Sequence, residues 1–150
     1  METAEYVTSE RTQYAQVFVL EKPLELERIG LALHKFGGEG QLWIDVCRDD
    51  HGKPGEIIAK SDMVDLGNLA EKPGYRWTDF PFSSNKPPMA PGSYWIALGF
   101  TGSPIVNWFY TYGKPVGPTD GTRYKGIFDK DWSGSLSYEF NYRVAGNITK

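Results

Sequence analysis

The sequence is poor in the residues on which most catalytic and metal sites depend. It has one cysteine, Cys47, so no internal disulfide can form, and only two histidines, His34 and His51. Nucleophilic catalysis usually needs a Ser or Cys beside an oriented histidine, and no G-x-S-x-G motif is present. The C-x-x-C, H-x-x-x-H and EF-hand spacings of metal sites are missing too. We therefore expect no enzymatic activity and no cofactor.

Long apolar runs and blocks of one charge are also missing. No stretch reaches the roughly 18 apolar residues of a membrane span, so we expect no membrane contact. The net charge is −3 with acids and bases mixed along the chain, which argues against nucleic-acid binding. Residues 1–13 are polar and lack the apolar core of a signal peptide. We expect a loosely ordered lead-in there, and either no export by such a signal or a module cut from a longer precursor.

What the sequence does contain favours strands and turns. It has 17 Gly, 10 Pro and 15% aromatic residues, and sheets favour aromatic and β-branched side chains while Gly and Pro favour turns. About eight or nine short strands are expected from alternation between turn signals: 14–20, 26–36, 41–48, 57–66, 75–82, 93–100, 106–112, 122–128 and 136–144. Residues 1–150 are therefore predicted to form a single all-β domain, a jelly-roll-like antiparallel β-sandwich.

Side-chain parity divides the strand residues into two faces. The predicted core face comprises Ile29, Leu31, Leu33, Leu42, Ile44, Val46, Tyr94, Ile96, Leu98, Leu136, Tyr138, Phe140 and Tyr142. The opposite face carries Gly30, Ala32, His34, Trp43, Asp45, Trp95, Ala97, Gly99, Glu139, Asn141 and Arg143. In the aromatic stretch 106–113, Trp108, Tyr110 and Tyr112 are predicted to be core, which places Asn107 and Thr111 on the outward face.

This outward face suits a sugar. Small residues leave a trough, tryptophan offers a flat apolar plane, and polar side chains can bond hydroxyls, as ligand sites combine apolar walls with few polar groups. We expect Trp43 and Trp95 to stack on the sugar. Asp45, Asn107, Glu139, Asn141 and Arg143 are expected to bond its hydroxyls. The alternative is that both tryptophans lie beneath loops 83–92 and 113–121, and Trp132 is either a rim contact or a loop anchor.

Two other groups of acidic residues carry weaker interpretations. Asp49, Asp50, His51 and Glu56 surround a turn that could hold structural calcium, but Asp and Gly are ordinary turn residues, and we interpret it as a polar hairpin. Asp45 and Glu139 are a conceivable carboxylate pair for glycoside hydrolysis, which needs two acids about 5–10 Å apart.

The order of motifs resembles bacterial β-sandwich modules of secreted and cell-surface proteins, among them the choice-of-anchor type and carbohydrate-binding-module-like domains. The residues that carry the resemblance are PLELERIGLAL, LWIDVCRDDHGKPGEIIAKSDMV, YRWTDFPF, MAPGSYWIALGF and NWFYTYG, between about residues 14 and 145. Such modules are jelly-roll-like and often accompany glycoside hydrolases or adhesive domains. The resemblance implies a non-catalytic extracellular module and carries over no binding residue.

The expected function is that of a non-catalytic carbohydrate-binding module. It would bind an oligosaccharide or polysaccharide as an accessory domain of a larger secreted or cell-surface protein, such as a glycoside hydrolase. The alternative is a structural or adhesion module that contacts other proteins in a cell-surface or phage assembly.

Overall fold

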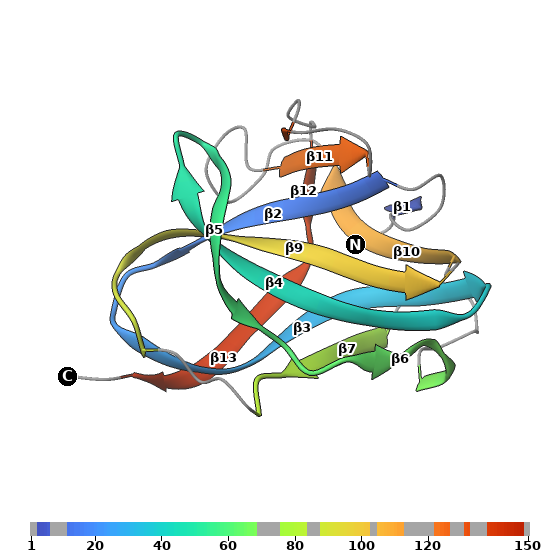
Figure 1. Ribbon diagram of the computed structural model, residues 1–150, viewed down its shortest axis with the longest axis horizontal. Helices are drawn as coiled ribbons and strands as arrows, with labels where there is room; N and C mark the ends of the chain where they lie inside the picture. The colour runs from blue at the N-terminus through green and yellow to red at the C-terminus, as the bar shows by residue number, and fades with distance from the viewer. Residues whose placement is uncertain are drawn as a thin grey trace.

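The protein is an all-β structure built from two antiparallel sheets (Figure 1). The computed structural model describes residues 3–6, 12–68, 76–83, 88–102, 105–112, 122–126, 131–132 and 138–148. Within these residues the only helical element is the 3-10 turn η2 (Leu66–Asn68). No helix there is long and apolar enough to cross a membrane.

Sheet A is the seven-stranded sheet, and its long central strand is β3 (Leu24–Gly37). One edge of β3 pairs with β7 (Arg76–Pro81) and β8 (Pro88–Met89), and the other pairs with β13 (Tyr142–Ile148) and then with β10 (Ile105–Tyr112). Strand β10 also pairs with β1 (Thr3–Tyr6) and β12 (Tyr138–Phe140).

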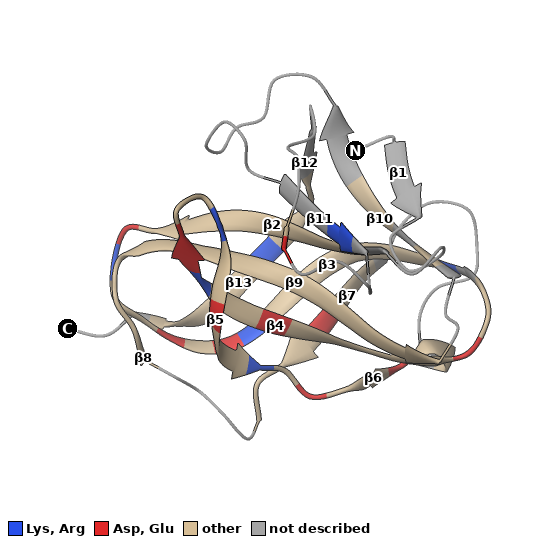
Figure 2. Cartoon of the chain, turned by 45° about the horizontal axis from the view of Figure 1, so that its top comes forward, with Lys and Arg blue, Asp and Glu red and all other residues tan. Residues whose placement is uncertain are grey.

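Sheet B has six strands in the order β11-β2-β9-β4-β5, with β6 on β4. Their bounds are β2 (Thr12–Leu20), β4 (Gly40–Asp50), β5 (Lys53–Lys60), β6 (Val64–Asp65), β9 (Gly92–Gly102) and β11 (Thr122–Gly126). In Figure 1, β2, β9 and β4 run side by side while β13 of sheet A crosses them at an angle. In the view of Figure 2, acidic and basic residues are scattered over the described strands and turns rather than gathered in one large patch.

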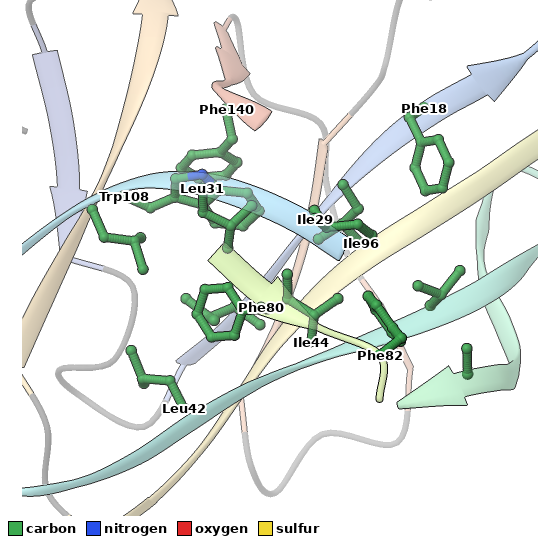
Figure 3. Close-up of a cluster of buried hydrophobic side chains, with 14 of the residues drawn as sticks. Phe18, Ile29, Leu31, Leu42, Ile44, Phe80, Phe82, Ile96, Trp108 and Phe140 are labelled. Carbon is green, nitrogen blue, oxygen red and sulfur yellow. The ribbon is translucent and has the colours of Figure 1, made fainter. Parts of the chain in front are cut away.

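The hydrophobic core lies between the two sheets and contains the described side chains that parity assigned to it. Leu136 and the side chain of Tyr138, also predicted to be core, lie outside the described part of the structure. Figure 3 shows Ile29 and Leu31 from sheet A facing Ile44 and Ile96 from sheet B. Trp108 is fully buried as predicted, and its ring stacks on Phe140 with centroids 4.2 Å apart. The side chains of Tyr110 and Tyr112 lie outside the described part of the structure.

The predicted hairpin at residues 49–56 joins β4 to β5. Its tip is His51 and Gly52, with φ of 55° and 83°. Two successive positive φ values are the geometry of a type I′ turn, which matches the twist of the flanking strands.

Four segments differ from the sequence prediction. The strand expected over 57–66 is two strands, β5 and β6, with residues 61–63 between them and Leu66 in η2. The lead-in contains strand β1, which pairs with β10, so residues 3–6 are not a loose tail. Loop 83–92 contains the short strand β8. The last strand, predicted as one unit over 136–144, is divided at Asn141 into β12 on β10 and β13 on β3. These pairings join distant segments, and periodicity within one segment carries no information about its partner.

Candidate functional site

The seven predicted ligand-binding residues belong to two different sheets. Trp43, Asp45 and Trp95 lie on β4 and β9 of sheet B, whereas Asn107, Asn141, Arg143 and Glu139 lie on or between strands of sheet A. The inter-sheet core separates the outer faces of the two sheets. The single groove expected from parity is therefore two separate surfaces.

Trp95 lies on the outer face of sheet B, as its parity predicts, but it is only 1% exposed. It packs with Ala15, Val17, Cys47 and Ala97 in a cluster distinct from the main core, and Trp132 packs against this cluster. Its indole N–H donates to Asp49 Oδ1 at 2.8 Å. Trp95 is thus covered, with Trp132 packed against its cluster, and its ring offers no open plane to a ligand. Loop 113–121, which was considered as a cover, lies outside the described residues.

Trp132 anchors its segment to this cluster. Asp131 beside it pairs with Lys53 at 2.8 Å and accepts the backbone N–H of Trp132 at 2.8 Å. These two hydrogen bonds hold the pKa of Asp131 below its usual value. The Nζ of Lys125 lies 5.1 Å from the Trp132 ring centroid, within cation–π range. Of the two interpretations of Trp132, these contacts favour the loop anchor.

Trp43 lies on the same outer face and packs on Gly99 of β9. A Cβ built at Gly99 would lie 2.4 Å from Trp43 Cε2, so only glycine fits beneath the ring. The Nζ of Lys60 lies 4.6 Å from the ring centroid. Asp45 follows two residues later, and burial raises its pKa, opposed by the Trp43 indole and by the charge of Lys60. The Trp43 indole nitrogen is buried without an acceptor in regular hydrogen-bond geometry among the described residues.

Cys47 is a buried member of the same face. Burial and the nearby charge of Asp45 raise the pKa of its thiol to about 12, against a smaller opposing effect of Lys125. Reactive cysteines need the opposite, a lowered pKa and access to solvent. Asp45 and Glu139, the pair considered for hydrolysis, lie on different sheets.

The acidic turn at residues 49–56 directs its side chains to separate partners. Asp49 accepts from Trp95, Asp50 pairs with His51 at 2.7 Å, and Glu56 lies 3.9 Å from Arg48. Among the described residues no group of three or more His, Cys, Asp or Glu side chains could hold a metal ion. These contacts agree with the interpretation of this segment as a polar hairpin.

The outer face of sheet A carries the more open arrangement, built on the small residues of β3. In one row across the sheet, Asp79 of β7 and Arg143 of β13 flank Gly30. In the row above, Trp77 pairs with Ala32, and in the row below Arg28 pairs with Ala145. Because neighbouring side chains on one face of a sheet lie within reach of each other, these residues form one surface, which we call the Gly30 face.

Arg143 crosses the Gly30 face to the β7 side. Its guanidinium carbon lies 4.1 Å from the Trp77 ring centroid, and its Nη2 lies 3.9 Å from Asp79 Oδ1. A Cβ at Gly30 would come within 2.8 Å of Asp79 Oδ1 and 3.4 Å of Arg143 Nε, so the absence of a side chain lets the two groups approach each other. Their side chains remain 54% and 52% exposed, so a ligand can reach both.

A depression of about 280 Å³ lies on this face. Its lining residues are Arg28, Gly30, Asp79, Arg143, Val144 and Ala145. Two guanidinium groups and one carboxylate around a floor without bulky side chains can hydrogen-bond the edge of a small polar ligand.

The other predicted residues of sheet A have different surroundings. The backbone of Asn141 donates to Phe109 O at 2.9 Å and accepts from Ala32 N at 3.4 Å and from Trp108 Nε1 at 3.1 Å. These backbone hydrogen bonds join β10 to β3 where the two strands diverge, and the side-chain nitrogen of Asn141 is buried. Asn107 and Glu139 pair through their backbones with His34 and Thr111, and their side chains lie outside the described part of the structure.

Trp77 and Asp79 belong to the Gly30 face but were not among the predicted site residues. The signal was present in the sequence, because Phe80 and Phe82 share one parity of this strand and Trp77 and Asp79 share the other; the structure buries the two phenylalanines. What parity could not supply was the pairing of β7 with β3, which brings Asp79 beside Gly30.

No model of a known protein family matches this chain, and no curated protein matches it as a significant relative. The argument for function therefore depends on the residues and geometry described above.

Proposed function

We propose that this chain is a non-catalytic carbohydrate-binding module, an accessory domain of a larger secreted or cell-surface protein such as a glycoside hydrolase. The binding site is assigned to the Gly30 face. Arg143 and Asp79 hydrogen-bond sugar hydroxyls, and Trp77 holds the Arg143 guanidinium in place.

The observation that supports this proposal most is the exposed Asp79–Arg143 pair across a glycine floor. A carboxylate accepts hydrogen bonds from hydroxyls and a guanidinium donates them, so the pair can bind the donor and acceptor edges of one sugar ring. Gly30 and Ala145 leave room for the ring above the strands. A volume of about 280 Å³ is near the lower limit of ligand pockets, which fits one sugar unit of a longer chain.

The alternative stacking surface on sheet B has weaker support. Trp95 is covered, and Trp43 lies between Gly99 and Lys60. A sugar could stack on Trp43 only after displacing the Lys60 ammonium group.

A glycan array followed by calorimetry on the best ligand tests the proposal, with Trp77→Ala and Trp43→Ala as a matched pair. Trp77→Ala should weaken binding about two- to thirtyfold, because a cation–π contact of about 0.5–2 kcal/mol no longer holds Arg143. Trp43→Ala on the opposite sheet should leave the affinity unchanged. The reverse result would move the site to sheet B, and no binding to any glycan would contradict the proposed function.

A structural or adhesion module is the second candidate, supported by one row of apolar residues on sheet B. Val17, Trp95, Cys47 and Ile57 pair in sequence across four strands, and the last of them is 56% exposed. An exposed apolar residue that continues a buried row is typical of a contact surface. If the module fails to bind glycans and Ile57→Lys abolishes its association with other domains of the parent protein, this second function replaces the first.

A further inference from the structure

We infer that the Gly30 face selects an anionic glycan, in which a carboxylate or sulfate group of the sugar binds between Arg28 and Arg143. This inference rests on the proposed function and adds the substrate class. It is argued from the charges that line the depression, from their contacts and from the space between them.

The charges around the depression favour an anion. The described residues of its lining include two arginines, Arg28 and Arg143, and one acidic residue, Asp79. Arg28 and Arg143 lie on adjacent strands in neighbouring rows, since Arg28 pairs with Ala145 and Arg143 pairs with Gly30. Diagonal neighbours of this kind are about 7–8 Å apart at Cα, and two guanidinium groups at that spacing can both reach one bound anion.

The carboxylate beside Arg143 leaves donors of that side chain available. The 3.9 Å between Arg143 Nη2 and Asp79 Oδ1 is longer than a hydrogen bond. Both side chains are about half exposed, and an exposed ion pair of this length contributes little. A sugar carboxylate or sulfate in the depression could instead form the short, paired hydrogen bonds that a guanidinium makes with planar or tetrahedral oxyanions.

The acidic residue closest along β3 has another partner. Glu27 Oε1 accepts a hydrogen bond from Asn147 Nδ2 at 2.9 Å, and Glu27 does not line the depression. Among the described residues, Asp79 is the one acidic residue in the lining. The Trp77 ring, 4.1 Å from the Arg143 guanidinium carbon, restrains that side chain before a ligand arrives, which lowers the entropic cost of binding.

The bound group is expected to be part of a sugar and not a free ion. The space of about 280 Å³ exceeds what a carboxylate or sulfate alone would fill, and Gly30 and Ala145 provide a floor on which a ring can lie. The protein as a whole carries a net charge of −3, so its overall electrostatic field repels anions. Any preference for an anionic ligand must therefore come from a local site.

The test compares glycan classes on one array: neutral oligosaccharides, uronic-acid oligosaccharides, their methyl esters and sulfated oligosaccharides. We expect uronic-acid or sulfated ligands to bind, and methyl esterification to weaken binding of a uronic-acid ligand about tenfold or more, because the charge-assisted hydrogen bonds are lost. The uronic-acid and sulfated ligands together show which anionic group the site prefers.

Substitutions of the two arginines test whether the preference for an anionic ligand comes from the Gly30 face. Arg28→Gln and Arg143→Gln should each weaken binding of the anionic ligand about tenfold, because each removes a charge-assisted hydrogen bond to the anionic group. Arg48→Gln is the matched control, since Arg48 is 61% exposed on sheet B. Affinity should fall as NaCl is raised from about 50 to 300 mM, and thermal melts check that each variant is folded.

Two outcomes separate this inference from the proposed function. If neutral glycans bind best and Arg28→Gln leaves their affinity unchanged, the anionic preference is wrong while the carbohydrate-binding function stands. If no glycan of any class binds, both are wrong.

Discussion

The side chain of Gln16 on sheet B accepts a backbone hydrogen bond from Phe140 on sheet A, with Oε1 and N 2.8 Å apart. Gln16 is 1% exposed, and its Nε2 donates to Val17 O at 3.0 Å. A buried polar side chain thus satisfies a backbone N–H of β12, the short strand where β10 and β3 have diverged. This bond ties the two sheets together at that point.

Gln16→Leu should lower the free energy of unfolding by about 1–3 kcal/mol, because it leaves the Phe140 N–H buried without its acceptor. Gln41→Leu, at an exposed position of β4, is the control and should change stability by less than about 0.5 kcal/mol. Urea denaturation measures both. Equal effects of the two substitutions would mean that the inter-sheet bond contributes nothing.

Trp95→Ala should destabilise the fold by about 3–5 kcal/mol, the usual cost of removing a buried aromatic side chain. The parity argument alone places Trp95 on the outward face as a sugar-stacking residue, but the ring is buried and Trp132 packs against its cluster. Trp132→Ala should cost less because that ring is only half-buried. A loss below about 1 kcal/mol for Trp95→Ala would show that the ring is not held in the cluster.

Gly99→Ala should destabilise the protein by about 1–3 kcal/mol, as overpacking does, since the new methyl group would overlap the Trp43 ring. In a Trp43→Ala background the same substitution should stabilise by about 0.5–1 kcal/mol, because Gly is unfavourable within a strand. A double-mutant cycle by denaturation measures this reversal. Additive effects would place the two residues out of contact.

Asp45→Asn should stabilise the protein at neutral pH. Burial raises the folded-state pKa of Asp45 above its ordinary 3.8, so ionisation costs more in the folded state than in the unfolded state. The wild-type carboxyl contributes most to stability below its unfolded pKa and loses that contribution as pH rises through its folded pKa. The stability difference between variant and wild type should therefore grow from pH 3 to pH 7.

Asp131→Asn is the control, for which the expected change in stability at neutral pH has the opposite sign. The pKa of Asp131 is lowered by its hydrogen bonds with Lys53 and the Trp132 N–H, so its charged form is favoured in the folded state above its unfolded pKa. This variant should be less stable than wild type at neutral pH, and the difference should vanish as pH falls through the folded pKa. Urea unfolding across this pH range measures the stability of both variants. If both substitutions change the free energy of unfolding at neutral pH in the same direction, the argument is wrong.

The sequence by itself determined the class of fold and the direction in which most strand residues face. Ile44 and Ile96 are in the inter-sheet core, and Trp43 and Trp95 are on the opposite face of their strands, because successive side chains in a strand alternate. This alternation is local, so residue order was enough to predict it.

Only the tertiary structure decided which outward residues share a surface. Trp43 and Arg143 both face outward, yet they lie on different sheets with the core between them, whereas Asp79 and Arg143 meet over Gly30. Strand pairing joins segments far apart in the chain through backbone hydrogen bonds that every residue type except proline can donate. The choice of partner therefore leaves little trace in any one strand, and the Gly30 face exists only once β7, β3 and β13 have paired.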